Sequence, residues 1–218
     1  MKVAAERLRG LHVLADDAPH WKSSVIAQAR AACEGGAAVV QLRAKTSTDR
    51  EALELAREIR ACTRAAGVVF IVNDRFDIAL ASEADGVHLG QGDLAPARLP
   101  DEARRRLIVG RSTHTPEQAR AAVGEPVDYL AFGPVFGTVS KDTGWVARGC
   151  DALAEIAAIA GGRPLVAIGG IDAENAAQVV AAGATGIAVI SAVSNAPGPA
   201  EAVRDLAAVL QPAADSSG

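Results

Sequence analysis

Short apolar runs recur along the whole chain, and most of them end in a polar or glycine-containing segment. The runs consist largely of β-branched residues and leucine, which is typical of parallel strands that are buried on both faces. Between them lie alanine-rich stretches with scattered charges, the pattern of helices that bury one face. The sequence therefore predicts strands that alternate with helices. The eight predicted strands are Leu11–Leu14, Ala38–Leu42, Val68–Val72, Gly86–His88, Leu107–Gly110, Tyr129–Ala131, Leu165–Ile168 and Gly186–Ile190.

This alternation indicates the α/β class, and specifically a single (β/α)8 barrel, or TIM barrel. The chain has 218 residues, half of them apolar, which suits one such domain with a large buried core. We expect the barrel to occupy residues 1–211 and the small polar residues 212–218 to form a frayed tail. Because the loops after the strands carry the chemistry of such barrels, the polar segments are expected to meet at one mouth.

The predicted helix ends are marked by capping residues and by glycine. Thr48 and Glu51 form the capping-box pattern, in which each side chain can bond a free amide at the helix start. Thr115–Gln118 repeats the device, with proline at the first helical position. Gly35-Gly36 and Gly161-Gly162 predict helix ends that need left-handed backbone.

Composition narrows the possible partners. The net charge of −4 gives no reason to expect nucleic acid or an anionic membrane, so anion binding must come from a local basic cluster. The three cysteines form no CxxC pattern, which argues against a zinc site or a disulfide framework. No apolar stretch has transmembrane length, and Met1–Gly10 is too charged for a signal peptide. We expect a cytoplasmic protein that binds small molecules, with assembly into a homo-oligomer left open.

The second predicted strand leads into a pair of cations. Arg43 and Lys45 stand two residues apart, so in extended backbone their side chains point the same way. Arginine can bind a diphosphate through two hydrogen bonds, and lysine binds it as a point charge. Gln41 precedes them with an amide able to read the edge of a heterocycle. The alternative interpretation is a solvated loop.

Carboxylates follow the third and fourth predicted strands. Asp74 stands in Asn73-Asp74, and Asp93 ends the Gln91-Gly92-Asp93 segment. Magnesium takes few protein carboxylates and completes its shell with water and substrate phosphate, so one aspartate on each of two adjacent loops suits it. The alternative for each aspartate alone is a helix cap or a turn residue.

Hydroxyls and histidines follow next. Ser112 could bond a diphosphate, and His114 could transfer a proton or bond a substrate, unless the segment is merely a capped loop. His12 and His88 lie on predicted strands and are expected to be buried and hydrogen-bonded. Phe136–Gly149 is the one long insertion and predicts a mobile lid, the alternative being a disordered loop.

A second anion site is predicted after the last two strands. Gly169-Gly170 would let backbone amides approach a phosphate closely, and Ser191 follows the eighth strand. Within the predicted lid, the Thr138–Lys141 segment carries two hydroxyls and a lysine that could close on a phosphate.

Together these segments are similar to a known family. VVQLRAK, IVNDRFDIAL, ADGVHLGQGDL, GRSTHT, DYLAFGPVFGTVSK, AIGGI and AVIS, in this order, resemble thiamine phosphate synthase and its relative, the thiazole tautomerase. The resemblance runs from about Leu11 to Leu210. It implies a transferase that condenses 4-amino-2-methyl-5-hydroxymethylpyrimidine diphosphate with a thiazole phosphate, releasing diphosphate, with Mg2+ as cofactor.

The resemblance also implies residue roles. The pyrimidine diphosphate would be held by Gln41, Leu42, Arg43, Ala44, Lys45, Asn73, Ser112 and Lys141, and magnesium by Asp74 and Asp93. The thiazole phosphate would be surrounded by Thr138, Val139, Ser140, Gly170, Ile190 and Ser191. Arg43, Lys45, Ser112 and Lys141 would act on the leaving diphosphate, and His114 would contact substrate.

The chain departs from the family pattern at two places. Gly137–Lys141 stands where the family often has Pro-Thr-x-Thr-Lys, and the first strand reads HVLADD instead of a tyrosine-containing Ile-Thr-Asp segment. Two alternatives stay open: a metal-free tautomerase that uses His114 for proton transfer, and a barrel that binds a thiamine precursor without catalysis. Asp93 favours the synthase, because the tautomerase needs no metal.

Overall fold

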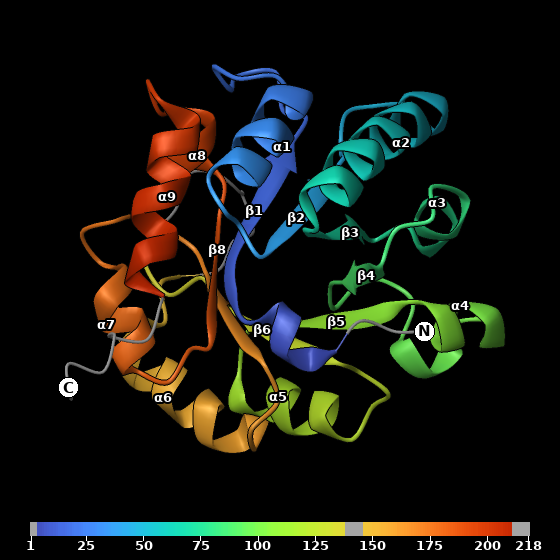
Figure 1. The fold of residues 1–218 in the computed structure, drawn as a ribbon. Coiled ribbons are helices and arrows are strands. Elements are labelled where there is room, and N and C mark those ends of the chain that lie inside the picture. Colours follow the sequence, from blue (N-terminus) through green and yellow to red (C-terminus); the bar gives the residue numbers. More distant parts are fainter. Residues whose placement is uncertain (1–3, 138–145, 211–218) are drawn as a thin grey trace, which may run out of the picture.

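The computed structural model describes residues 4–137 and 146–210. Among these residues, eight parallel strands close into a barrel in which each strand pairs with its chain neighbours and β8 pairs with β1 (Figure 1). This confirms the predicted TIM barrel, and every predicted strand overlaps an observed one. The strands are β1 (Gly10–Asp16), β2 (Val39–Arg43), β3 (Val69–Asn73), β4 (Gly86–Leu89), β5 (Ile108–Thr113), β6 (Tyr129–Phe132), β7 (Leu165–Ile168) and β8 (Gly186–Val189). The predicted tail, residues 212–218, lies outside the described residues.

Helices form a ring around this barrel (Figure 1). A short 3-10 helix, η1, precedes β1, and a helix follows each strand before the next one begins. They are η1 (Ala5–Leu8), α1 (Val25–Glu34), α2 (Asp49–Ala66), α3 (Phe76–Ala81), η2 (Pro96–Arg98), α4 (Asp101–Arg106), α5 (Pro116–Val123), α6 (Gly149–Ala160), α7 (Ala176–Ala181), α8 (Ser191–Ser194) and α9 (Pro199–Val209).

The predicted caps are mostly present. Thr48 and Glu51 form the full capping box at the start of α2. At α5 the Thr115 side chain accepts from the amide of Gln118, as predicted. The Gln118 side chain, however, accepts from the amide of His114 at 2.8 Å and so ties the preceding loop to the helix. The pattern therefore predicted the helix start but not the extra bond to the site residue before it.

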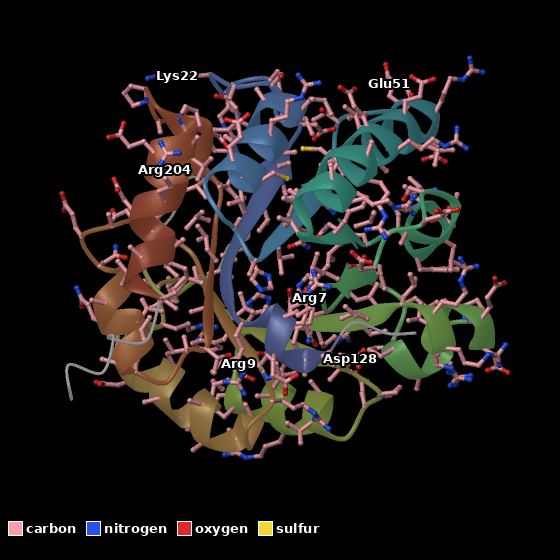
Figure 2. All side chains as sticks on the ribbon, in the orientation of Figure 1. Arg7, Arg9, Lys22, Glu51, Asp128 and Arg204 are labelled. Carbon is pink, nitrogen blue, oxygen red and sulfur yellow. The ribbon has the colours of Figure 1, made fainter. Side chains whose placement is uncertain are left out.

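The buried residues form two layers. Inside the barrel lie inward-pointing strand residues such as Leu14, Ile71 and Ile108, and Leu8 of η1 packs against them. Between strands and helices lies a second, larger cluster that includes Leu42, Val72 and the buried faces of the helices. Burying each such side chain contributes about 1.5–3 kcal/mol. Figure 2 shows charged side chains such as Glu51 and Arg204 projecting outward from the helical ring.

β1 and β5 extend two and three residues further toward the mouth than predicted, and β2, β3, β4 and β6 extend by one residue. β1 continues to Asp16, which pairs in register with Arg43, and β5 continues to Thr113, which pairs with Phe132. Ser112 therefore stands on a strand and not in the loop after it. Apolar patterning ends where polar residues begin, whereas ladder pairing continues through them. In the described part of the chain, none of the helices is long and apolar enough to cross a membrane.

Candidate active site

The carboxyl ends of the strands surround a cavity of about 260 Å³. Most of the predicted site residues within the described part of the chain line it. These are Gln41, Arg43, Lys45, Asn73, Asp74, Asp93, Ser112, His114, Gly170, Ile190 and Ser191. Thr138, Val139, Ser140 and Lys141, with most of the predicted lid, lie outside the described residues.

Two predicted substrate-binding residues point away from this cavity. Leu42 is 1% exposed and belongs to the apolar layer under the helices, and Ala44 packs against the same layer. Successive side chains of a strand point to opposite faces, so in β2 Gln41 and Arg43 face the mouth while Leu42 faces outward. Ala44 and Lys45, just after the strand, continue this alternation. A side-chain contact to a ligand in the cavity is therefore excluded for these two residues.

Lys45, Asp74 and Asp93 meet at one side of the cavity. Lys45 Nζ lies 2.5 Å from Asp74 Oδ2, and the carboxyl groups of Asp74 and Asp93 are hydrogen-bonding neighbours. The Gly90 amide donates to Asp93 Oδ2 at 2.7 Å and holds that carboxyl in place. Asp74 has a φ of 65°, a left-handed conformation that costs energy in a residue other than glycine and is often found at functional sites.

The two carboxyls differ in their affinity for a proton. Burial and the neighbouring Asp74 raise the pKa of Asp93. Burial acts the same way on Asp74, but hydrogen bonds from Lys45 and Asp93 outweigh it and lower the pKa of Asp74. Two acidic groups this close favour a shared cation. Among the described residues no three or more His, Cys, Asp or Glu side chains cluster as metal ligands, so a metal held here would need other ligands as well.

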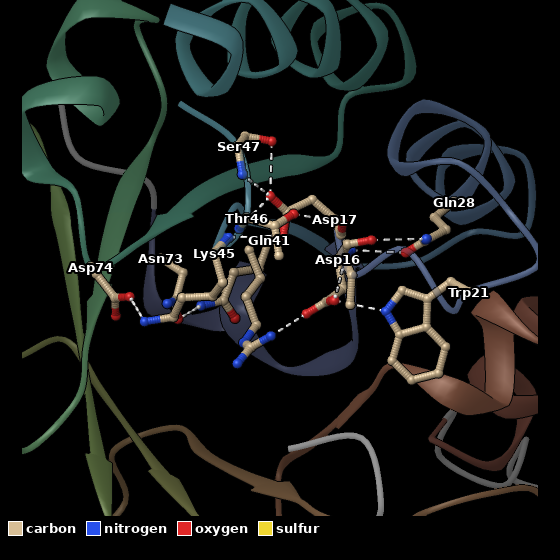
Figure 3. Close-up of polar contacts among 12 residues, drawn as sticks. Asp16, Asp17, Trp21, Gln28, Gln41, Lys45, Thr46, Ser47, Asn73 and Asp74 are labelled. Atoms are coloured by element: carbon tan, nitrogen blue, oxygen red, sulfur yellow. Dashed lines mark hydrogen bonds and ion pairs between the residues drawn. The ribbon is translucent and has the colours of Figure 1, made fainter. Parts of the chain in front are cut away.

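Asp16, at the end of β1, is a site residue that sequence reasoning missed. Its carboxylate is buried and accepts from Arg43 Nη1 at 2.5 Å and from the Trp21 indole at 2.7 Å. The Gln28 side chain bonds the Asp16 backbone at both its amide and its carbonyl (Figure 3). Arg43 is thus anchored at one nitrogen by a fixed, buried anion, which sets the direction of its guanidinium toward the cavity.

The neighbouring Asp17 organises the loop that carries Lys45. Its carboxylate accepts from the backbone amides of Lys45, Thr46 and Ser47 at 2.7–2.9 Å and from the Ser47 hydroxyl (Figure 3). Although burial acts in the opposite direction, these hydrogen bonds lower the pKa of Asp17. A sequence signal for both aspartates exists, because Asp16-Asp17 directly follows the first apolar run. The other predicted site residues follow their strands in the same way.

The amide of Gln41 is also held in place. Its Nε2 donates to Asn73 Oδ1 at 3.0 Å, across the β2–β3 pair (Figure 3). Both side chains line the cavity. The Gln41 amide, which was predicted to bond the edge of a heterocycle, is therefore held by a partner on the next strand.

The predicted burial of the two strand histidines is confirmed. His12 bonds the carbonyl of Leu8 at 2.8 Å, and burial lowers the pKa of His12 to about 4. His88 lies 2.8 Å from both the Tyr129 hydroxyl and the Ser112 hydroxyl. His114 lines the cavity, with its Nδ1 2.6 Å from the carbonyl of Gly133.

The opposite side of the cavity combines glycine backbone with apolar residues such as Ile168 and Ile190. Gly169 and Gly170 have φ values of 106° and 62°, and a Cβ on Gly170 would lie 2.4 Å from the carbonyl oxygen of Gly137. Phe136 donates its amide to the Gly169 carbonyl, so the loop after β6 is fastened to the loop after β7. Ser191 stands at the start of the short helix α8. Glycine is needed here both for its backbone angles and for the close approach of the two loops.

Comparisons with known proteins agree with one another. The chain matches a family model described as thiamine monophosphate synthase over residues 11–193. It is 48% identical over 197 residues to the thiamine-phosphate synthase of Methanoregula boonei, with 90% of each chain covered. It is 47% identical to that of Chlorobium luteolum, with 82% of this chain and 84% of the relative covered. The solved structure of thiamine phosphate pyrophosphorylase from Pyrococcus furiosus matches with a TM-score of 0.84 and 36% identity, covering 95% of this chain and 98% of that one.

Proposed function

The chain belongs to the thiamine monophosphate synthase family, and we propose that the two sides of its barrel mouth each hold one of two phosphorylated substrates. As a member of this family it is a transferase of thiamine biosynthesis. It condenses 4-amino-2-methyl-5-hydroxymethylpyrimidine diphosphate with a thiazole phosphate to give thiamine phosphate and diphosphate. The comparisons favour neither the tautomerase nor the non-catalytic barrel.

The charged side of the cavity would hold the pyrimidine diphosphate. Arg43 keeps its remaining guanidinium hydrogens for the phosphates while Asp16 fixes its direction, and Lys45 adds a second cation. Ser112 adds a hydroxyl, and the paired amides of Gln41 and Asn73 would bond the pyrimidine. His114 would contact substrate from the neighbouring wall.

Asp74 and Asp93 would hold Mg2+. The residues fit this ion, because two oxygen ligands from adjacent strands leave room for water and phosphate oxygens in an octahedral shell. Burial and the neighbouring Asp74 both raise the pKa of Asp93, and a cation bound between the two carboxylates would offset both effects. When bound, the ion would neutralise negative charge on the leaving diphosphate.

The chain's own residues suit a dissociative reaction. The bond between the exocyclic methylene carbon and the diphosphate oxygen breaks first, and its electron pair leaves with the diphosphate. Arg43, Lys45 and Ser112 would stabilise that leaving group, together with Lys141 by resemblance. The electron-rich pyrimidine stabilises the resulting cation, and the thiazole nitrogen then donates its lone pair to form the new bond. No protein nucleophile is required.

The glycine side would hold the thiazole phosphate close to the reacting carbon. The amides around Gly170, with Ile190 and Ser191, would form its phosphate pocket, and Thr138, Val139 and Ser140 would cover it by resemblance. The observation that carries the proposal is the placement of Arg43, Lys45, Asp74 and Asp93 on one wall of the cavity that Gly170 and Ser191 also line.

The test is a two-substrate assay with and without Mg2+. Mixing both substrates should release diphosphate and form thiamine phosphate in a magnesium-dependent way. Isomerisation of a thiazole phosphate without metal and without diphosphate release would instead establish the tautomerase. Binding of either substrate without turnover would establish the non-catalytic barrel.

A further inference from the structure

A chain of three side chains, of which Tyr129 and His88 are buried and Ser112 is half-buried, leads from the barrel interior to the cavity. The Tyr129 hydroxyl on β6 lies 2.8 Å from His88 Nδ1 on β4, and His88 Nε2 lies 2.8 Å from Ser112 Oγ on β5. Tyr129 reaches across β5 because Gly110 leaves room for its ring: a Cβ on Gly110 would lie 2.1 Å from Tyr129 Cζ. Three adjacent strands thus contribute one connected hydrogen-bond chain.

Tyr129, at the buried end of this chain, determines which group donates each hydrogen bond. Tyr129 is 1% exposed, and burial raises the pKa of its phenol, so the hydroxyl keeps its hydrogen. Among the described residues, this hydroxyl has one hydrogen-bond partner, Nδ1 of His88. A buried O–H left without an acceptor is unfavourable, so Tyr129 donates to Nδ1.

The state of Nδ1 of His88 determines the state of its other ring nitrogen, Nε2. A neutral imidazole that accepts at Nδ1 carries its hydrogen on Nε2, and this N–H donates to Ser112 Oγ. The Ser112 hydroxyl then accepts from His88 and keeps its own hydrogen for an acceptor in the cavity. With the reverse polarity, Ser112 would donate to His88 and present only lone pairs to the cavity.

We propose that Tyr129 and His88 are positioning residues that orient the Ser112 hydroxyl as a hydrogen-bond donor toward the diphosphate of the substrate. Diphosphate oxygens that carry negative charge accept hydrogen bonds, so only the donor orientation of Ser112 is attractive to them. The inference rests on the proposed function, because it takes Ser112 to contact the diphosphate. It adds that a residue on β6, two strands away from His88, determines which way that hydroxyl points.

The first test reads the polarity directly in the free enzyme. In protein labelled with 15N-histidine, NMR distinguishes a ring nitrogen that carries hydrogen from one that does not, and the His88 signals are assigned by their loss in His88→Gln. We expect Nε2 of His88 to carry the hydrogen and Nδ1 to be bare. A hydrogen on Nδ1, with Nε2 either bare or also protonated, would overturn the inference, whether or not any variant of Tyr129 folds.

The second test measures whether Tyr129 acts through Ser112. Binding of inorganic diphosphate with Mg2+ is measured for wild type, Tyr129→Phe, Ser112→Ala and the double variant. Tyr129→Phe should weaken binding about fivefold, near the value of one net hydrogen bond, and should add nothing in the Ser112→Ala background. Thr113→Val is the matched control, since it removes a buried hydroxyl beside Ser112 that bonds only the Ala131 carbonyl in the described contacts. It should leave binding unchanged.

The two possible failures are distinguishable. An equal loss from Tyr129→Phe in both backgrounds would overturn the inference and leave the proposed role of Ser112 standing. Unchanged diphosphate binding in Ser112→Ala would contradict the proposed function at this residue, and the inference would fall with it.

Discussion

The two sides of the cavity differ in the groups that line them and in the contacts that hold those groups. On the side of β1 to β4, charged side chains face the cavity, and other side chains hold them: Asp16 holds Arg43, and Asp17 holds the loop of Lys45. On the side of β6 to β8, glycine backbone and apolar residues such as Ile168 and Ile190 line the cavity, and the loop after β6 holds the glycine backbone through amide-to-carbonyl bonds. On the first side an amide can replace a carboxylate with almost no change of shape, whereas on the second side a Cβ added at Gly170 would lie 2.4 Å from the Gly137 carbonyl oxygen.

Under the proposed function, this difference explains how one barrel can distinguish two anionic substrates that bind side by side. A diphosphate carries more negative charge than a single phosphate and binds together with a metal ion, so it needs cations and carboxylates in fixed places. A single phosphate can be held by backbone amides and a helix start. The variants that follow separate the two sides, from the largest expected effect to the smallest.

Asp93→Asn should abolish most activity, by roughly 10²-fold or more, while the fold is kept. The amide has nearly the same shape and can still accept from Gly90, but one negative charge of the proposed metal site is lost. The measurement is turnover as a function of Mg2+ concentration, with circular dichroism as the check on folding. Asp77→Asn is the matched control, since Asp77 is an exposed partner of Arg75 away from the cavity. Wild-type turnover in Asp93→Asn would remove this residue from the metal site.

Gly170→Ala should raise KM for the thiazole phosphate by about 10²-fold, the scale of an ångström-sized displacement in a site, with little change for the pyrimidine diphosphate. The added Cβ would lie 2.4 Å from the Gly137 carbonyl oxygen and push the two loops apart. Gly162→Ala is the control: it has the same left-handed strain, with a φ of 88°, and open space for its Cβ. If both variants change KM alike, backbone strain alone is responsible and the phosphate pocket is not at Gly170.

Arg43→Ala should weaken binding of the pyrimidine diphosphate more than binding of the thiazole phosphate. The expected loss of binding free energy is about 1.5–3 kcal/mol, the value of one charge-assisted contact. Arg60→Ala is a suitable control, because Arg60 is equally buried and pairs with Asp85 but lies outside the cavity. It should lower the free energy of unfolding without changing either affinity. Equal losses for both substrates in Arg43→Ala would mean that the two phosphates are assigned to the wrong sides.

His114→Ala should have the smallest effect, a decrease of about tenfold in condensation through lost positioning. A dissociative synthase needs no proton transfer at the bond-forming step, whereas loss of a general acid or base typically costs about 10²- to 10⁴-fold. The measurement is single-turnover formation of thiamine phosphate. A loss in the larger range would place a proton transfer at His114 and favour tautomerase chemistry.

The charged side could be predicted largely from the sequence, because charged residues that follow apolar runs are conspicuous. The i, i+2 spacing of Arg43 and Lys45 required only a strand, and Asp74 and Asp93 required only two adjacent strands. The same alternation should have excluded the Leu42 and Ala44 side chains, which a continuous motif had included. The fold was predictable for a similar reason, since eight buried strands at regular intervals have few other arrangements.

The parts that could not be predicted depend on pairing across strands. The bond between Asp16 and Arg43 requires the register of β1 on β2, and the contact of Tyr129 with His88 skips a strand. The glycine side was predicted only as a weak motif, because glycine carries no side chain whose chemistry can be recognised. Its φ values and the approach of the Gly137 carbonyl become visible only in three dimensions.

The fit of Tyr129 over Gly110 has a consequence for protein engineering. The two positions share one volume, so any side chain added at Gly110 has to be matched by a smaller one at Tyr129. A randomised library that varies Gly110 alone samples almost no accessible sequences, whereas one that varies both positions together can exchange a ring on β6 for a ring on β5. Such paired libraries are a route to barrels of this family whose interior is repacked while the outer ring of helices is unchanged.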